Sequence, residues 1–240
     1  MNLLTIFVFV LIIVLIYVVY KLMTKTTSTV SGFSDASRST MVPCKDDINT
    51  TNNYGYSVWL YIDAWDITGT HDINKNLLTR CDSTGVPLFK LYLDNAQNNL
   101  KLIMRGNETS TCTISNIQLQ KWINLTMSVY GNTVDLYLDG KLVRTCIMAT
   151  LPAGLTSTDD LYIGGGYDLD SNTTKITPAD GDLKGYISNV VYKANYFTPE
   201  EAWSIYGDGY SGAGMFDFLH SYKLNFSVTN NNQVMSQFSI

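Results

Sequence analysis

The chain is poor in glutamate and contains no run of basic residues. Asp and Glu number 21 against 16 Lys and Arg in 240 residues, which gives a net charge of −5. No segment is suited to neutralising a phosphate backbone, so nucleic acid is not an expected partner. Only three of the acids are glutamates, namely Glu108, Glu200 and Glu201. Few glutamate carboxylates are therefore available for acid–base catalysis.

Histidine and paired cysteine motifs are also scarce. His71 and His220 lie far apart in sequence, and neither neighbours a Gly-x-Ser-x-Gly motif, so a nucleophilic triad is not indicated. The cysteines include no Cys-x-x-Cys pair, which argues against a zinc site. They permit three disulfide pairings or none, and the sequence favours buried thiols at Cys44, Cys81, Cys112 and Cys146. We expect no catalytic function.

The first 23 residues form a long apolar run. No charge interrupts residues 3–20, which as a helix reach roughly the 30 Å thickness of a bilayer core. The charged start and small-residue cleavage site of a signal peptide are missing. We therefore expect a transmembrane helix over residues 1–23, anchored in membrane lipid by Leu3, Phe7, Phe9, Leu11, Ile12, Leu15, Tyr20 and Lys21.

The next segment bears on the orientation of the chain. Residues 24–42 are rich in Ser and Thr without an apolar period, which predicts a flexible tether. Lys21, Lys25 and Arg38 follow the apolar run, so the positive-inside rule favours a body that faces the cytoplasm or, in a virion with an inner membrane, the shell. Five glycosylation sequons favour the opposite side, and they begin at Asn49, Asn107, Asn124, Asn172 and Asn225. Asn124 lies in a predicted strand, which is a poor place for a glycan. For the orientation we therefore give the basic residues more weight than the sequons.

From residue 54 onward the pattern is that of an all-β protein. Residues 54–62 alternate between two kinds of side chain, as in a strand with two different faces. Nine further runs have strand character: 76–80, 88–93, 99–104, 112–117, 123–130, 133–138, 141–148, 161–164 and 183–193. Asp139-Gly140 is typical of a two-residue hairpin turn. A capping box with proline predicts one helix over residues 198–207. We expect a sandwich of two antiparallel sheets.

Six segments resemble, in order, the motifs of a laminin-G-like domain of the concanavalin A-like lectin/glucanase superfamily: 56–62, 121–126, 133–143, 161–165, 185–192 and 197–201. The resemblance implies a concanavalin A-like jelly roll, which we assign to residues 43–214. It implies fold more than function. Glucanases of this kind carry Glu-x-Asp-x-x-Glu, which this chain lacks. We expect Trp122 to cap the core and Gly185 to allow close approach of a neighbouring strand.

An acidic region is the best candidate for a metal site. Asp168, Asp170 and Asn172 have the spacing of oxygen ligands in a calcium loop, and Asp180 and Asp182 follow shortly afterwards. The resemblance adds that pentraxins and some laminin-G modules bind calcium at loop edges. The chain departs from the EF-hand pattern at two positions, and ordinary solvated turns are the alternative. Calcium is the one cofactor that the sequence suggests.

Aromatic residues are abundant, with 16 Tyr, 9 Phe and 4 Trp. Sugar-binding faces use aromatic rings beside amides and carboxylates, and protein interfaces are equally rich in Tyr. The C-terminal segment, residues 215–240, alternates like a strand that would join the sandwich or a neighbouring molecule. Its expected partner-contact residues are Tyr222, Leu224, Phe226 and Val228.

Two functional classes remain open. The first is a non-enzymatic, single-pass membrane protein whose jelly roll contacts other structural proteins. By analogy with large icosahedral DNA viruses that contain a membrane, this protein would be a minor capsid protein that links the shell to the membrane. The alternative is a membrane-anchored carbohydrate-binding lectin on a cell or virion surface, with glycans as partners.

Overall fold

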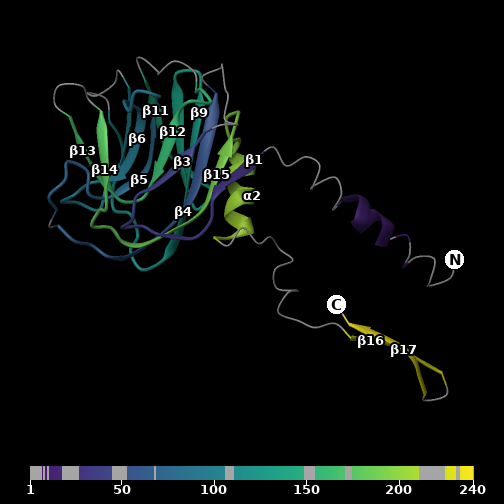
Figure 1. Cartoon of the computed structure of the whole chain (residues 1–240). Coiled ribbons are helices and arrows are strands. Elements are labelled where there is room, and N and C mark those ends of the chain that lie inside the picture. Colours follow the sequence, from purple (N-terminus) through teal and green to yellow (C-terminus); the bar gives the residue numbers. More distant parts are fainter. Residues whose placement is uncertain are drawn as a thin grey trace.

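The computed structural model of the chain is a sandwich of two antiparallel sheets (Figure 1). The predicted all-β jelly-roll architecture is confirmed. The structure describes residues 7, 9, 11–17, 27–44, 53–67, 69–105, 111–148, 155–170, 175–210, 225–230 and 233–239.

Seven strands in this part of the chain form the larger sheet. Six of them follow in the order β1, β15, β4, β9, β10 and β11, and β2 pairs with β15. Their bounds are β1 Thr27–Ser31, β2 Ser34–Asp35, β4 Tyr54–Ala64, β9 Trp122–Tyr130, β10 Thr133–Leu138, β11 Lys141–Ile147 and β15 Lys184–Lys193.

The smaller sheet has six described strands in the order β3, β12, β5, β6, β7 and β8. Their bounds are β3 Thr40–Pro43, β5 Asn76–Cys81, β6 Pro87–Leu93, β7 Leu100–Met104, β8 Cys112–Ile114 and β12 Asp160–Ile163. A separate hairpin of β13 (Gly166–Leu169) and β14 (Ile176–Ala179) lies beside this sheet (Figure 1).

The core lies between the two sheets and follows the alternation of the strands. In β4, Val58, Leu60 and Ile62 are almost fully buried and pack against apolar residues of the smaller sheet, such as Phe89 and Leu91. Because successive side chains of a strand point to opposite faces, residues 57, 59 and 61 point away from this core. The outer face of the larger sheet therefore presents its own set of side chains.

The predicted turn and helix are both present. Asp139 and Gly140 connect β10 to β11 with φ angles of 48° and 72°, as a two-residue hairpin turn requires. Helix α2 (Pro199–Asp208) begins with the predicted capping box, in which Thr198 and Glu201 bond each other's backbone N–H groups. It runs past the expected stop at Gly207, and Gly209 caps it instead.

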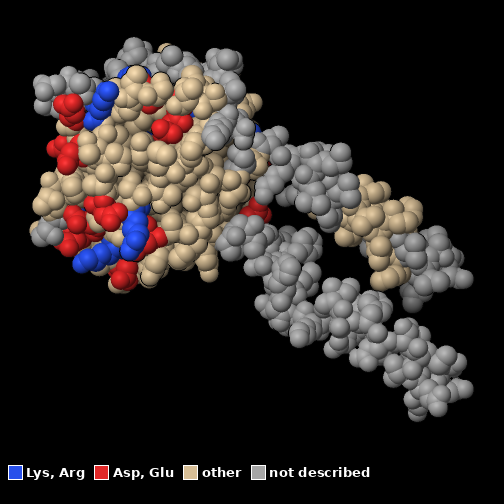
Figure 2. Space-filling view, in the orientation of Figure 1, with Lys and Arg blue, Asp and Glu red and all other residues tan. Residues whose placement is uncertain are grey.

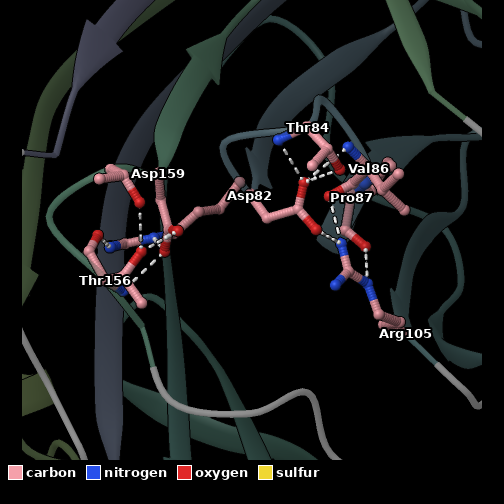
Figure 3. A network of polar contacts seen from close by, with 9 residues as sticks. Asp82, Thr84, Val86, Pro87, Arg105, Thr156 and Asp159 are labelled. Carbon is pink, nitrogen blue, oxygen red and sulfur yellow. Dashed lines mark hydrogen bonds and ion pairs between the residues drawn. The ribbon is translucent and has the colours of Figure 1, made fainter.

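A buried ion pair lies beside the smaller sheet, and a hydrogen bond from the same arginine reaches the larger sheet (Figure 3). Arg80 Nε donates to the Asp159 carboxylate at 2.9 Å, and Arg80 Nη1 donates to the Tyr56 hydroxyl at 2.6 Å. The backbone N–H and hydroxyl of Thr156 also donate to Asp159. Burial opposes the charge of Arg80, but its neighbours Tyr56, Cys44 and Asp159 raise its pKa above the ordinary value. The guanidinium thus stays charged inside the core.

The segment expected to be a flexible tether differs from that prediction. Three strands, β1 to β3, come from residues 24–42, and Ala36 between them is fully buried. Thr and Ser in β1 pair with β15 at the edge of the larger sheet, where one side of the strand stays polar. A polar edge strand has no clear apolar period, which explains why the sequence pattern suggested a tether. The sandwich therefore begins before residue 43.

Described residues 7, 9 and 11–17 are helical, and their apolar side chains are exposed. They include five of the predicted anchor residues: Phe7, Phe9, Leu11, Ile12 and Leu15. The predicted anchor residues Leu3, Tyr20 and Lys21 lie outside the described residues. Within the described part of the chain, none of the helices has both the length and the apolar character needed to span a bilayer.

Two of the four cysteines form a disulfide, which differs from the expectation of four buried thiols. Cys112 in β8 and Cys146 in β11 form a disulfide, which connects edge strands of the two sheets. Sequence spacing cannot reveal this pair, because the two residues are 34 positions apart and meet only when both sheets have formed. Cys44 and Cys81 are buried thiols, as expected. Burial raises the pKa of Cys81 to about 12, which keeps its thiol protonated.

The C-terminal strands form their own hairpin. β16 (Asn225–Asn230) and β17 (Gln233–Ser239) pair with each other and, among the described strands, with no strand of the sandwich (Figure 1). Of the two alternatives expected for this segment, joining the sandwich is not observed for β16, and contact with a neighbouring molecule stays a prediction. Phe226 and Val228 lie in β16, whereas Tyr222 and Leu224 lie outside the described residues.

Candidate functional site

A row of three aromatic residues crosses the outer face of the larger sheet. Tyr186 in β15 pairs with Tyr61 in β4, and Tyr61 pairs with Trp122 in β9. Their neighbours in the strands, such as Leu60 and Ile123, point into the core. The rings of Tyr61 and Trp122 have centroids 5.6 Å apart, and those of Tyr61 and Tyr186 are 6.4 Å apart. Trp122 therefore belongs to an outer aromatic row and does not cap the core as predicted.

Two further aromatic rings flank this row. Tyr210, just beyond α2, stacks on Trp122 with a centroid distance of 4.7 Å and an interplanar angle of 1°. Phe33, between β1 and β2, stacks on Tyr186 at 5.1 Å. Phe33 is 64% exposed and Tyr210 is 46% exposed. The five rings thus form a partly exposed aromatic surface built from segments distant in sequence.

Helix α2 covers the neighbouring part of the same face. Trp59, two residues before Tyr61 in β4, is only 4% exposed because Tyr206 of α2 stacks on it at 5.7 Å. Phe197 covers the face above Gly55, where an added Cβ would lie 2.3 Å from the ring. The helix and the residues before it therefore cover Trp59 and Gly55 and leave the Tyr186–Tyr61–Trp122 row partly exposed.

The aromatic row forms the floor of a hollow of about 730 Å³, which we call the aromatic hollow. Its polar lining consists of Asp35, Ser37, Asp63 and Lys184. The backbone N–H and hydroxyl of Ser37 both donate to Asp35, and these bonds lower the pKa of the Asp35 carboxyl. Lys184 lies 3.5 Å from Asp66. The hollow thus combines stacking surfaces with hydrogen-bond acceptors.

A second hollow of about 410 Å³ lies on the other side of Phe33 and Tyr210, and we call it the polar hollow. It is lined by both of these rings together with Thr27, Thr29, Gly32, Ser188, Asn189, Val191, Ile205 and Asp208. Ser188 donates from its hydroxyl to the carbonyl of Tyr210 at 2.8 Å, which fixes the segment after α2 against β15. The aromatic hollow and the polar hollow together are the candidate site.

The predicted calcium residues lie around the β13–β14 hairpin. Asp168 accepts from the backbone N–H of Asp72 and lies 3.1 Å from the His71 imidazole; these contacts, led by His71, lower its pKa. Asp180 accepts from the backbone N–H of Ser39 at 3.4 Å. The remaining predicted ligands are Asp170 at the end of β13, Asp182 after β14, and Asn172, which lies outside the described residues.

The structure does not gather these acids into one described cluster. In the described part of the chain, no group of three or more His, Cys, Asp or Glu side chains is arranged to hold a metal ion. On the face shown in Figure 2, charged side chains gather toward the side that carries β13 and β14. Calcium binding by this loop region stays a prediction.

Two of the three glutamates, Glu200 and Glu201, lie in the first turn of helix α2. Glu201 caps α2 and pairs with Lys193. Burial opposes the charge of Glu201, but the bonds from Lys193 and Thr198 lower its pKa. Glu200 lies in the first turn of the same helix, and Glu108 lies outside the described residues. Glu200 and Glu201 thus serve the start of α2, away from both hollows.

The fold agrees with the comparison with protein families. The model described as the concanavalin A-like lectin/glucanases superfamily, of the laminin-G type, matches residues 34–202. The chain belongs to this family. The concanavalin A-like domain thus includes β2 and β3 and extends into α2. A comparison with curated protein sequences finds no match.

Solved structures share the concanavalin A-like fold at low identity. The botulinum neurotoxin serotype D binding domain is 14% identical, with a TM-score of 0.51 over 76% of this chain and 42% of that one. The ligand-binding domain of the same toxin in complex with N-acetylneuraminic acid is 14% identical, with a TM-score of 0.52 over 76% of this chain and 46% of that one.

A SAP-like pentraxin from Limulus polyphemus is 13% identical, with a TM-score of 0.49 over 70% of this chain and 74% of that one. The chain spans less than half the length of the neurotoxin binding domains. At 14% identity the likeness to the neurotoxin domains shows the fold alone.

Proposed function

We propose that the protein is a non-enzymatic, membrane-anchored carbohydrate-binding protein whose glycan site is the pair of hollows on the outer face of the larger sheet. The observation that carries this proposal is the partly exposed aromatic row with carboxylates at its edge. Ring faces pack well against the C–H groups of a pyranose, and Asp35 and Asp63 are available to accept hydrogen bonds from sugar hydroxyls. Membership in a superfamily that includes lectins supports the same function.

The absence of catalytic activity is part of the proposal. Retaining hydrolysis of a glycoside uses two carboxyl groups about 5 Å apart on either side of the scissile bond. Of the three glutamates, Glu200 and Glu201 belong to the start of α2. Incubation of the protein with the glycans that it binds is expected to give no cleavage products by mass spectrometry, and turnover would contradict this part.

We further propose that residues 1–23 anchor the protein in a membrane and that the sandwich faces an oxidising compartment. The uncharged run over residues 3–20 supports the anchor. The Cys112–Cys146 disulfide supports an oxidising environment. This orientation departs from the cytoplasm-facing expectation, which counted Arg38 among the basic residues near the membrane. Arg38 lies in the turn between β2 and β3 and so belongs to the sandwich.

The orientation can be tested on protein from its native membrane. We expect the Cys112–Cys146 disulfide to be intact when thiols are blocked before lysis. We also expect a glycosidase-sensitive shift on a gel from at least one sequon other than Asn124. Asn124 is fully buried and bonds Ser57, so it is closed to a glycan. Free thiols at all four cysteines with no shift would place the sandwich in the cytoplasm.

A glycan array with the full-length protein in detergent micelles tests the binding function. We expect specific binding that Trp122→Ala weakens at least tenfold. Trp203→Ala is the control, because Trp203 is a tryptophan that is 53% exposed and lines neither hollow. Binding that is as strong in Trp122→Ala as in the wild type, or an array without signal, would contradict the proposed site.

A structural role is the second candidate, and one observation favours it. Strand β11 forms an edge of the larger sheet and exposes Leu142, Val143 and Ile147, with Ile147 80% exposed. An exposed apolar edge strand is suited to pairing with a strand of another protein. The minor capsid protein that links a shell to a membrane is the specific form of this candidate. Crosslinking of the native assembly through Lys141 would identify such a partner, and a chain without protein neighbours would exclude the role.

A further inference from the structure

The two hollows meet at the same pair of rings. Phe33 and Tyr210 line both the aromatic hollow and the polar hollow. A ligand longer than one sugar that stacks on Trp122 would therefore continue past Phe33 and Tyr210 into the polar hollow. Both hollows combine aromatic rings with polar groups, but only the aromatic hollow contains the Tyr186–Tyr61–Trp122 row and only the polar hollow contains an amide side chain.

The polar hollow supplies groups that suit a second sugar. Thr27 and Thr29 of β1 contribute hydroxyls, Asn189 of β15 contributes an amide, and Asp208 of α2 contributes a carboxylate. Asn189 has a φ of 45° and lies where the pairing of β15 with β4 is interrupted between Ser188 and Val191. A bulge of this kind re-aims side chains relative to a regular strand. Donors and acceptors thus lie next to the aromatic stacking surface.

The charge of the lining selects against anionic sugars. Three carboxylates line the two hollows, namely Asp35, Asp63 and Asp208, against one amine, Lys184. The lining therefore carries a formal charge of −2. The Lys184 side chain is 62% exposed, and its amine forms an ion pair at 3.5 Å with Asp66, which does not line either hollow. A sialylated or sulfated glycan would bring a further negative charge next to the lining carboxylates.

We propose, on the basis of the proposed glycan-binding function, that the site takes neutral oligosaccharides of at least two sugars across both hollows and rejects sialylated and sulfated ones. The sugar on the Tyr186–Tyr61–Trp122 row supplies the stacking contact. The next sugar bonds Thr29, Asn189 and Asp208. This preference differs from the sialic acid seen in the neurotoxin binding domain of similar fold.

The experiment uses the full-length protein in micelles and two sets of ligands. The first set is a ladder from one to four sugars for neutral glucose, galactose, mannose and N-acetylglucosamine series. The second set contains the sialylated and sulfated counterparts of the neutral ligands that bind. We expect the affinity to rise about tenfold from one sugar to three, and to fall about tenfold when the ligand carries a sialic acid or sulfate.

Variants then assign each effect to its hollow. Thr29→Val and Asn189→Gly remove hydrogen-bonding groups from the polar hollow while retaining the strand and the positive φ. They are expected to weaken the longer ligands about fivefold and to leave the monosaccharide unchanged. The double variant Asp35→Asn with Asp63→Asn is expected to reduce the difference in affinity between a neutral ligand and its sialylated counterpart. Glu200→Gln lies outside both hollows and is expected to leave this difference unchanged.

Two results would overturn this inference and leave the proposed function standing. One is Trp122-dependent binding in which a monosaccharide binds as tightly as its longer relatives. The other is a sialylated or sulfated ligand that binds as tightly as its neutral counterpart. Binding of no glycan in either set would overturn the proposed function together with this inference.

Discussion

The buried ion pair between Arg80 and Asp159 leads to the sharpest prediction for stability. Both side chains are nearly inaccessible, at 0% and 2% exposure. Asp159→Ala would remove the acceptor of one bond from Arg80 and of two bonds from Thr156 (Figure 3). The guanidinium would keep its charge inside the core without its carboxylate. We expect a loss of about 3–5 kcal/mol of unfolding free energy, a large share of the roughly 5–15 kcal/mol typical of a domain.

A double variant separates the loss of the pair from the cost of leaving one charge unpaired. Arg80→Met with Asp159→Leu replaces both charges by apolar groups and is expected to be more stable than Asp159→Ala alone. Urea unfolding followed by tryptophan fluorescence measures all three proteins. A loss below about 1 kcal/mol for Asp159→Ala, or a double variant no more stable than Asp159→Ala, would refute the reasoning.

Three further predictions concern the disulfide, a surface carboxylate and a strand glycine. Replacing Cys112 and Cys146 by serine is expected to cost about 3–4 kcal/mol in urea unfolding, because the disulfide spans a sequence separation of 34; an unchanged midpoint would contradict this. Burial opposes ionisation of Asp82, but bonds from neighbouring groups lower its pKa to about 2. Its stabilising effect is present above the ordinary pKa near 3.8 and is lost as pH falls to about 2. Between pH 3.8 and 2 the wild-type protein should therefore lose about 1–2 kcal/mol more unfolding free energy than Asp82→Asn. Parallel curves of unfolding free energy against pH for the two proteins would refute this. Gly185→Ala would bring a Cβ within 1.9 Å of the Tyr61 carbonyl oxygen, so it should cost about 1–3 kcal/mol and weaken glycan binding; full stability would contradict the close approach.

Much of the sandwich is predictable from local sequence patterns. The ten strands expected from alternation correspond to β4 to β12 and β15, with ends that differ by a few residues. Local chemistry determines these features, because alternation follows the two faces of a strand and Asp139-Gly140 adopts the positive φ of a hairpin turn. The close passage expected at Gly185 is also present, against the backbone of Tyr61.

The candidate site is harder to predict from local sequence patterns than the sandwich. Phe33 lies in the segment expected to be a tether, and Tyr210 lies just after the helix, so neither position has a local signal for a site. Trp122, Tyr61 and Tyr186 were visible as alternating positions of predicted strands. Their grouping depends on strand order and register, which join residues more than 60 positions apart. The helix that covers Trp59 and leaves Tyr61 accessible is a further tertiary effect.

Binding to the aromatic row is the central claim, and titration calorimetry with the best ligand from the array tests it most directly. The full-length wild-type protein, Trp122→Ala and Trp203→Ala are compared in the same micelles. We predict that Trp122→Ala weakens binding at least tenfold, about 1.4 kcal/mol or more, while Trp203→Ala binds like the wild type. Equal affinities for all three proteins would contradict the assignment of this face as the glycan site.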